Sequence, residues 1–536
     1  MMVLIMRELP LSPIACFAFL AVTAYAASDA YPPARFTDPQ RVAKLESAFP
    51  KIDKLFQEYV AQRGIPGMTW GIVIDGRLAH VQSTGLANRG SGAAPSRDTV
   101  FRIASMTKSF TALAILKLRD DGKLSLEDPV AKWIPEFARM EMPTRDTPPL
   151  RVRDLLTHGA GFPEDNPWGD QQLGASDDEL TAWLKKGIPF SSTPGTRYEY
   201  SNYGFGLLGR VVTKAAGMPY EKYLQTQILA PLKMTASTLN SSDVPADRRA
   251  VGYRRLPDGS YAEEPPLPHG AFGAMGGLLT SASDLGKYVA FQLAAWPPRD
   301  DDDPGPVRRS SVREMNHLWR TSNLAVRRPA GKLQAEVSGY GYGLRISADC
   351  RFDHIVGHGG GLPGYGSYMA WLPNHGVGIF AMTNLTYAGP SRPIGEAWDI
   401  LLATGGLRPR ELPAAPILTK TRDSIVKLWK SWDSAEIKKI AAMNLLIDIP
   451  EQQRQNQIRD LKADVGECSS ISPVMAENWL RGQFNMTCEK GTVGVFFTLA
   501  PTRAPGVQAL SFQRIAEPST RLSAPTGAPP GITCSE

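Results

Sequence analysis

The stretch FRIASMTKSFTALAILKL, residues 101–118, sets a hydroxyl and an amine in an otherwise apolar segment. Its apolar spacing predicts a helix over residues 105–121 that ends at a C-terminal glycine. Ser105 and Lys108 are three residues apart, so they share one face of that helix, and Ser105 lies at the positive end of the helix dipole. Burial makes a lysine easier to deprotonate, and a neutral amine beside a hydroxyl is a base that can generate a nucleophile.

The same pattern has an ordinary structural interpretation. Serine is a common N-cap, and a lysine in a helix usually lies on a solvated face. The chain contains a second Ser-x-x-Lys, SIVK at residues 424–427, which we interpret as plain helix surface. The motif by itself therefore leaves open whether Ser105 and Lys108 are catalytic.

Two further stretches bear on that question. In YEYSNYGFGLLG, residues 198–209, Tyr200 and Asn202 stand directly before an apolar helix. In IVGHGGGLPGYGSYMAWLP, residues 355–373, His358 and three glycines precede a strand, and such glycines let the backbone of a ligand lie close. Each side chain also has a structural alternative: Tyr200 as a core aromatic, Asn202 as a helix cap, and His358 as a hydrogen-bonded histidine at a strand edge.

In this order the motifs resemble those of the serine β-lactamase and penicillin-binding protein family: Ser-x-x-Lys, Tyr-x-Asn, then Lys/His-x-Gly on an edge strand. The similarity is to the branch that holds class C β-lactamases, D-Ala-D-Ala carboxypeptidases, D-aminopeptidases and β-lactamase-like esterases. The connecting segments 152–162, 228–239 and 273–288 also look like this family. The resemblance covers roughly residues 40–405.

The resemblance implies a role for each residue of the first two motifs. Ser105 attacks a carbonyl and becomes acylated, while Lys108 takes or relays its proton. Tyr200 is the matching phenol, held partly ionised by nearby positive charge, which protonates the leaving group and later activates the hydrolytic water. Asn202 holds Lys108 and the substrate amide in place.

The third motif supplies the remaining substrate contacts. The resemblance implies that the backbone N–H groups of Ser105 and Gly361 form the oxyanion hole, a device worth about 10²–10³ in rate per donor. We expect Asn202, His358, Gly360 and Gly361 to bind the substrate. His358 replaces the lysine that is more usual in the family, which leaves no fixed cation for a substrate carboxylate.

This departure affects the expected substrate. β-Lactams and D-Ala-D-Ala peptides carry a carboxylate, although carboxypeptidase relatives use histidine at this place. We expect an exported serine hydrolase that acts through an acyl-enzyme on an ester or amide: an esterase, a D-amino-acid peptidase or a weak β-lactamase. The alternative is a non-catalytic binding or cell-wall adaptor protein of the same fold.

The order of strand and helix patterns predicts an α+β fold. Two β-rich runs flank Asp75-Gly76 within residues 67–84, a strong hairpin signal, and strands return from about residue 340. Residues 150–260 look mostly helical and rich in loops. An antiparallel sheet built from both ends of the domain and covered by helices is the natural assembly, and it matches the β-lactamase-like fold of the resemblance.

With 536 residues, the chain is too long for one core. The Pro-rich stretch RPRELPAAP, residues 408–416, marks a linker before a second, smaller α+β domain. The predicted segments are a signal peptide at 1–26, a β-lactamase-like serine hydrolase domain at 27–407, a linker at 408–420, a small α+β domain at 421–515 and a loose tail at 516–536.

The first 26 residues predict export to the periplasm or the medium. A short charged start precedes an apolar run and the small-x-small cleavage site Ala24-Tyr25-Ala26. That run is shorter than the ~20 residues that span a bilayer, so we expect no stable membrane span. The net charge of +6 is spread along the chain without Lys/Arg blocks, which argues against nucleic acid as a partner.

Four of the five cysteines follow the predicted signal peptide. We expect Cys468 and Cys488 to pair, because a loop of that size gains about 3 kcal/mol from closure in an oxidising compartment. Cys350–Cys534 is a guess for a second bridge. The cysteines lack zinc-ligand spacing, so we expect no metal and no cofactor, and a small-molecule or peptide substrate as the partner. The sequence leaves the oligomeric state open.

Overall fold

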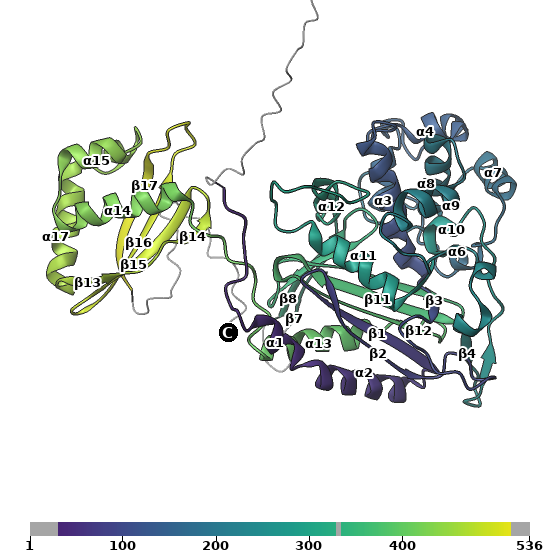
Figure 1. Ribbon diagram of the computed structural model, residues 1–536. Helices are drawn as coiled ribbons and strands as arrows, with labels where there is room; N and C mark the ends of the chain where they lie inside the picture. Colours follow the sequence, from purple (N-terminus) through teal and green to yellow (C-terminus); the bar gives the residue numbers. More distant parts are fainter. Residues whose placement is uncertain (1–30, 328–333, 516–536) are drawn as a thin grey trace, which may run out of the picture.

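The computed structural model describes residues 31–327 and 334–515. Its largest element is an antiparallel sheet of eight strands in the order β2-β1-β12-β11-β10-β9-β8-β7 (Figure 1). The strands are β1 (Gly67–Ile74), β2 (Arg77–Gly85), β7 (Arg320–Arg327), β8 (Gln334–Tyr340), β9 (Arg345–Asp349), β10 (Ile355–Leu362), β11 (Tyr365–Leu372) and β12 (Val377–Thr383). Because β1 lies beside β12, the sheet is built from both ends of the domain, as the sequence predicted.

Turn chemistry explains the first hairpin. Asp75 and Gly76 join β1 to β2 with φ values of 49° and 78°, the left-handed conformations that a two-residue hairpin turn requires. On its other side β1 pairs with β12 in antiparallel register, with Ile72 opposite Ile379. Every residue of β1 is buried, because helices cover both faces of the sheet at this point.

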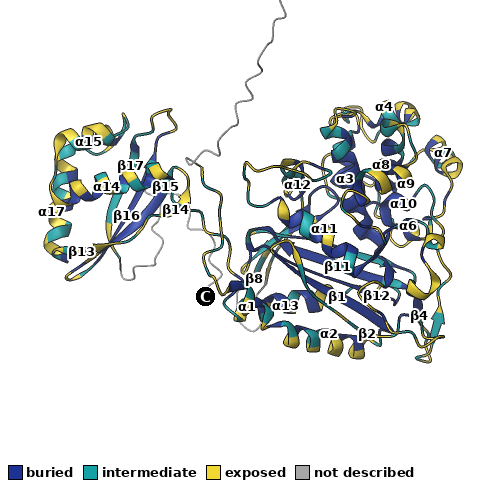
Figure 2. Cartoon of the chain, viewed as in Figure 1, coloured by how far each residue is buried: buried dark blue, intermediate teal, exposed yellow. Residues whose placement is uncertain are grey.

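Figure 1 shows α2 and α13 on one face of the sheet and α11 on the other. The helices next to the sheet are α1 (Arg41–Glu46), α2 (Phe49–Arg63), α11 (Ala282–Ala294) and α13 (Ser391–Ala403). The core beneath α2 contains Phe56 stacked on Trp70 at 5.2 Å between ring centroids. On the α11 side, Val289 and Phe380 belong to a larger core that also contains residues of the helical region. Figure 2 shows helix α3 (Thr107–Asp120) of that region as mostly buried.

The helical region lies between β2 and β7 in sequence and carries the first two motifs. Its helices are α3 (Thr107–Asp120), α4 (Val130–Trp133), α5 (Val152–Leu156), α6 (Trp168–Gln171), α7 (Asp177–Lys186), α8 (Asn202–Ala216), α9 (Tyr220–Leu224), α10 (Gly273–Gly276) and α12 (Arg309–Met315). Two small strand pairs, β3 (Val100–Arg102) with β6 (Leu279–Ser281) and β4 (Tyr253–Arg255) with β5 (Tyr261–Glu263), connect it to the sheet side.

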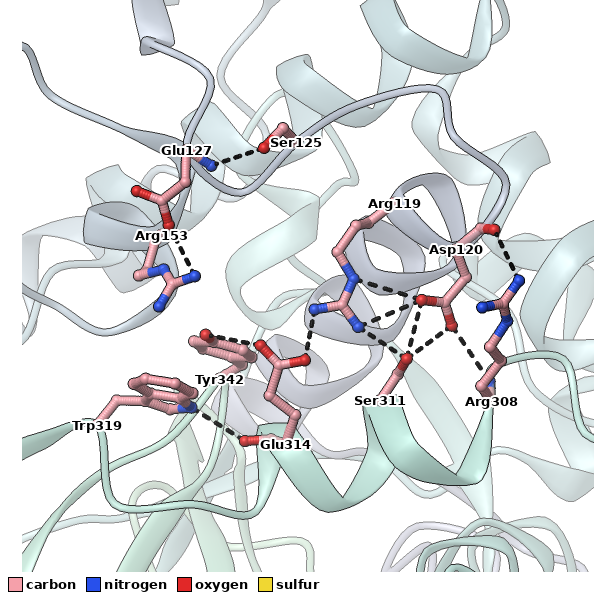
Figure 3. Close-up of polar contacts among 10 residues, drawn as sticks. All are labelled: Arg119, Asp120, Ser125, Glu127, Arg153, Arg308, Ser311, Glu314, Trp319 and Tyr342. Atoms are coloured by element: carbon pink, nitrogen blue, oxygen red, sulfur yellow. Dashed lines mark hydrogen bonds and ion pairs between the residues drawn. The ribbon is translucent and has the colours of Figure 1, made fainter. Parts of the chain in front are cut away.

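Polar contacts fix the C-terminal end of α3 to α12 (Figure 3). Arg119 donates a hydrogen bond from Nη1 to Glu314 Oε2 at 2.5 Å, and Ser311 Oγ donates to the Asp120 carboxylate at 2.8 Å. The first turn of α3 is fully buried. Helix α3, which carries Lys108 of the Ser-x-x-Lys motif, is therefore held at both ends.

The C-terminal part forms its own sheet and its own core. Five strands assemble in the order β13-β15-β16-β17, with β14 pairing on β15. They are β13 (Cys468–Ile471), β14 (Met475–Asn478), β15 (Arg481–Cys488), β16 (Gly491–Leu499) and β17 (Val507–Ile515), and the helices are α14 (Pro416–Lys430), α15 (Ser434–Ile440), α16 (Leu445–Asp448) and α17 (Glu451–Val465). Helix α14 begins inside the predicted linker, and Leu418 already belongs to this core. Cys468 and Cys488 form the expected disulfide.

Several sequence predictions fall outside the described residues: the signal peptide at 1–26, the tail at 516–536 and the Cys534 half of the second bridge. Within residues 31–327 and 334–515, every helix falls short of the length and apolarity that a bilayer-spanning segment needs.

Candidate active site

Ser105 lies in one 3₁₀ turn, η1 (Ala104–Met106), directly before α3. The sequence predicted a helix start at Ser105, whereas the α-helix begins two residues later, at Thr107. The residue before Ser105, Ala104, has a φ of 50°, a conformation that non-glycine residues seldom adopt. Ser367 holds the turn from β11, because its Oγ donates to the carbonyl of Ile103 at 2.8 Å. Strain of this kind, held by its surroundings, is common at functional sites.

Lys108 is fully buried, with its amine surrounded by three oxygen acceptors. Nζ lies 3.0 Å from Ser105 Oγ, 2.7 Å from Asn202 Oδ1 and 2.8 Å from the carbonyl oxygen of Met275. A neutral amine has two N–H donors and one lone pair. It donates to Asn202 and Met275, which turns the lone pair toward the hydroxyl hydrogen of Ser105.

Burial lowers the pKa of Lys108 to about 7, because the charged form loses its hydration inside the protein. The carboxylates of Asp170, Asp165 and Glu164 oppose this shift, and the guanidinium of Arg345 adds to it. The amine is therefore substantially neutral near pH 7. Lys108 is thus a buried amine within hydrogen-bond reach of the Ser105 hydroxyl.

Tyr200 stands two residues before α8, and its ring lies beside Lys108, with Nζ 4.9 Å from the ring centroid. His158 packs on the same ring at 4.3 Å between centroids. Burial raises the pKa of Tyr200 far above its usual range, although a hydrogen bond with Ser105 and the positive charge of Arg345 lower it. The phenol is thus protonated at neutral pH, in contrast to the partial ionisation that the resemblance implies, and it is placed to give a proton.

Asn202 is the first residue of α8, and its amide is held from both sides. Its Oδ1 accepts from Lys108, and its Nδ2 donates to Asn166 Oδ1 at 2.5 Å. The backbone N–H of Asn202 donates to Asp165 Oδ1 at 2.7 Å, so Asp165 caps the helix together with the Ser201 hydroxyl, which accepts from Gly204. The amide therefore cannot turn its oxygen away from the lysine.

The glycines of β10 form the wall opposite Ser105. A Cβ at Gly360 would collide with the carbonyl of Ile103, so only glycine lets the strand lie this close to the Ser105 turn. Leu362 and Tyr365 flank a two-residue turn and form the hydrogen-bonded pair that closes it. Because hydrogen-bonded and non-hydrogen-bonded pairs alternate along an antiparallel ladder, the next pair, Gly361 with Gly366, is not hydrogen-bonded. The N–H of Gly361 thus points away from β11, toward the edge of β10 that β9 leaves open beyond residue 357.

The imidazole of His358 lines the pocket and is held in place by hydrogen bonds inside the protein. The ring is buried, and both nitrogens are engaged inside the protein: Nε2 lies 2.8 Å from the hydroxyl of Tyr340, and Nδ1 lies 2.5 Å from the carbonyl oxygen of Gly359. Burial, reinforced by the charges of Arg345 and Lys108, lowers the pKa of His358 well below its usual range. A neutral ring accepts from Tyr340 and donates to Gly359, and these two contacts fix the orientation of the ring.

Sequence reasoning missed a cation at the site. Arg345 of β9 pairs with Gly357 of β10, and its guanidinium lies 5.6 Å from the centroid of the Tyr200 ring. Both Arg345 and His358 line the pocket in front of Ser105. A cation therefore does line the pocket, although His358 stands where the family usually has lysine: the neighbouring strand brings Arg345 there. A single arginine in a strand pattern carries no signal in the sequence, because only the register of β9 on β10 brings it here.

These groups open on one pocket of about 480 Å³. Ser105, Tyr200, His358 and the three glycines line it, while Lys108 and Asn202 lie buried behind Ser105. Asp170 and Tyr387 line it as well, and sequence reasoning did not point to either. A larger hollow of about 1210 Å³ lies between residues 135–143 and 184–190 and contains none of the predicted site residues. In the described ranges no cluster of three or more metal-ligating side chains occurs.

Comparison with known proteins gives a consistent assignment. A family model described as Beta-lactamase matches residues 52–404. Esterase EstB of Burkholderia gladioli is 28% identical over 372 residues, which cover 64% of this chain and 92% of EstB. Protein flp of Staphylococcus aureus strain N315 is 26% identical over 341 residues, 62% of this chain and 63% of flp. The chain thus spans less than two thirds of the length of flp.

A solved structure extends the comparison to the fold. The octameric penicillin-binding protein homologue from Pyrococcus abyssi matches with a TM-score of 0.58 at 23% identity, over 88% of this chain and 96% of the homologue. At that identity the match concerns the fold alone.

Proposed function

This chain belongs to the Beta-lactamase family, and from that premise we propose that it is a serine hydrolase that works through an acyl-enzyme on an ester or amide. One observation carries the proposal: the buried amine of Lys108 lies 3.0 Å from Ser105 Oγ, and burial lowers its pKa to about 7. A base matched to neutral pH within hydrogen-bond reach of a hydroxyl is what nucleophilic catalysis by serine requires.

Acylation begins with proton transfer from the Ser105 hydroxyl to the neutral amine of Lys108, as Oγ forms a bond to the carbonyl carbon of the substrate. Negative charge develops on the carbonyl oxygen, and the N–H groups of Ser105 and Gly361 stabilise it. The protonated phenol of Tyr200 donates its proton to the leaving group when the carbon–heteroatom bond breaks, and the ammonium of Lys108 restores that proton. The acyl group remains on Ser105, and Lys108 is neutral again.

Deacylation repeats these transfers with water. A water molecule attacks the acyl carbon and passes its proton to the Tyr200–Lys108 pair. The bond to Ser105 Oγ then breaks, and Oγ takes the proton back. Asn202 keeps the amine aligned in both halves, because its oxygen accepts from Nζ throughout.

The pocket favours substrates with a small carboxylate beside the scissile bond. Arg345 is its cation, and a guanidinium binds carboxylates in a planar, bidentate way. D-Amino-acid peptides and β-lactams carry such a group, whereas simple esters do not. Because the relative EstB is named as an esterase, the proposal also includes ester hydrolysis. The substrate class is therefore an ester, a D-amino-acid amide or, as a weak activity, a β-lactam.

The decisive experiment replaces the nucleophile. Full-length protein is incubated with a fluorophosphonate and with a fluorescent penicillin, and turnover is measured on p-nitrophenyl esters, nitrocefin and D-Ala peptides. We expect an adduct on the peptide that contains Ser105, and its loss together with turnover in Ser105→Ala. The matched control is Ser424→Ala, in the second Ser-x-x-Lys of the chain, where Lys427 is exposed on α14; it keeps both adduct and turnover.

Two outcomes contradict the proposal. Turnover that survives in Ser105→Ala excludes the mechanism. A folded wild-type protein that forms no adduct at Ser105 with either probe, and turns over none of the substrates, points to the non-catalytic binding protein instead.

We further propose that the protein is exported to the periplasm or the medium. The signal-like residues 1–26 and the Cys468–Cys488 disulfide support this, since such bridges persist in oxidising compartments. N-terminal sequencing of the mature protein from its source tests it: a start at Ala27 is expected, and a retained Met1 in a cytosolic fraction contradicts it.

A further inference from the structure

Tyr387 has an unusual backbone for an aromatic residue. It follows β12 and has a φ of 54°, in the left-handed region that disfavours side chains with a Cβ. Its N–H donates to the carbonyl of Tyr365 at 3.2 Å, at the turn between β10 and β11, and its own carbonyl accepts from the N–H of Gly389 at 3.0 Å. The strained conformation is thus held from two sides, which fixes where the ring points.

The ring of Tyr387 lies against the glycine strand. A Cβ at Gly361 would come within 2.7 Å of Tyr387 Cδ1, so the ring packs directly on the residue proposed to supply an oxyanion N–H. Nearly half of Tyr387 remains exposed, and the residue lines the same pocket as Ser105. An aromatic ring in this position narrows the pocket beside the reacting carbonyl.

The other end of Tyr387 reaches the helical region. Its hydroxyl donates to Asp170 Oδ2 at 3.2 Å, and Asp170 is a buried residue of α6 that also lines the pocket. The preceding residue, Gly169, packs on the side chain of Asn202, because a Cβ there would lie 2.7 Å from Asn202 Cβ. Helix α6 is therefore fixed next to the catalytic groups, and Asp170 is a firm anchor for the tyrosine.

We propose that Tyr387 and Asp170 form a hydrogen-bonded bar across the pocket that limits the size of the substrate group lying beside Gly361. This proposal rests on the proposed function and deepens it, since it assigns the residues that select the substrate. The bar joins the sheet wall to the helical wall in front of Ser105. Small, unbranched substrate groups fit beside Gly361, whereas bulky substrate groups collide with the ring of Tyr387.

The test measures size selectivity. Wild type and variants are assayed with two substrate pairs: p-nitrophenyl acetate against p-nitrophenyl trimethylacetate, which differ in the acyl group, and methyl against benzyl acetate, which differ in the leaving group. In Tyr387→Ala we expect kcat/KM for the bulky member, relative to the small one, to rise about tenfold or more in one pair, the range that a few carbon atoms are worth in a pocket.

Two milder variants separate the ring from its hydrogen bond. Tyr387→Phe keeps the ring and loses the donor, and Asp170→Ala keeps the ring and loses the acceptor. We expect each to raise the same ratio about threefold, less than Tyr387→Ala does, because the ring stays in the pocket and loses only one of the contacts that hold it. Tyr31→Ala, which removes an exposed tyrosine outside the pocket, is the matched control and keeps the wild-type ratio.

The outcomes separate this proposal from the proposed function. Hydrolysis by wild type with ratios unchanged in Tyr387→Ala for both pairs overturns the bar and leaves the hydrolase intact. Absence of any turnover or adduct at Ser105 overturns the hydrolase. Independently of activity, a crystal structure in which the Tyr387 hydroxyl lies beyond hydrogen-bond reach of Asp170 overturns the bar.

Discussion

The side-chain oxygen of Asn202 accepts a hydrogen bond from Nζ of Lys108 at 2.7 Å, across 94 residues of sequence. Asn166 holds the other side of the same amide, and Ser105 Oγ lies 3.0 Å from the same amine. Ser105, Lys108 and Asn202, the proposed nucleophile, its base and the residue that aligns the base, therefore form one buried unit. Its behaviour with pH and on substitution follows from these contacts.

The first prediction concerns the pH dependence of activity. Burial places the pKa of Lys108 at about 7, below the usual value for lysine, and the neutral amine is the active form. Activity therefore rises with pH through about 7 and falls below it, as the amine becomes protonated. The measurement is kcat/KM against pH for a substrate without titrating groups. An activity that stays flat from pH 5 to 9 contradicts a role for Lys108 as the base.

The second prediction uses Asn202 to move that pKa. Asn202→Asp places a carboxylate where the amide oxygen now accepts from Nζ, and an opposite charge favours the ammonium. The pH at which kcat/KM reaches half of its maximum should therefore rise by about one unit or more. Asn166→Ala, which removes the partner on the far side of the amide without adding a charge, is the control. An unshifted half-maximal pH in Asn202→Asp would show that another group sets the profile.

The third prediction tests the phenol. Tyr200→Phe keeps the ring beside Lys108 but removes the proton donor, so kcat should fall by about 10²–10⁴. Tyr203→Phe is the matched control three residues away. The buried hydroxyl of Tyr203 has no hydrogen-bond partner among the described residues, and its loss should change kcat less than about threefold. Comparable losses in the two variants would remove Tyr200 from the mechanism.

The fourth prediction separates carboxylate recognition from catalysis. Arg345→Met should raise KM for a D-Ala peptide by about tenfold or more, as expected for a lost charge-assisted hydrogen bond, while affecting a neutral p-nitrophenyl ester far less. Arg392→Met, at an exposed position on α13, is the charge-matched control. An equal rise in KM for both substrates assigns Arg345 to the structure of the site and not to substrate choice.

The fifth prediction concerns the C-terminal domain. The Cys468–Cys488 bridge closes a loop with a sequence separation of 20 residues, and Cys488→Ser should lower the free energy of unfolding of this domain by about 3 kcal/mol. Because this domain has its own core, ester turnover at 25 °C should not change. Urea unfolding of the full chain, followed by far-UV circular dichroism alongside turnover, checks both. Loss of turnover in parallel with the C-terminal transition would show that the two cores unfold together.

The amino-acid sequence determined what depends on local chemistry. The Asp75-Gly76 turn indicated the first hairpin of the sheet, the spacing of apolar residues indicated α3, and the order of the three motifs indicated the family. Helix α14 begins at Pro416, inside the predicted linker, because a proline is equally typical of a linker and of the first turn of a helix.

Only the tertiary structure decided the chemistry of the pocket. Arg345 reaches Tyr200 through the register of β9 on β10, His358 is held by a hydrogen bond between its Nε2 and Tyr340, and Tyr387 contacts Asp170 across 217 residues of sequence. The pKa of Lys108 likewise depends on complete burial. Contacts and pKa values of this kind arise from desolvation and from neighbours that are distant in sequence, so no local pattern of residues contains them.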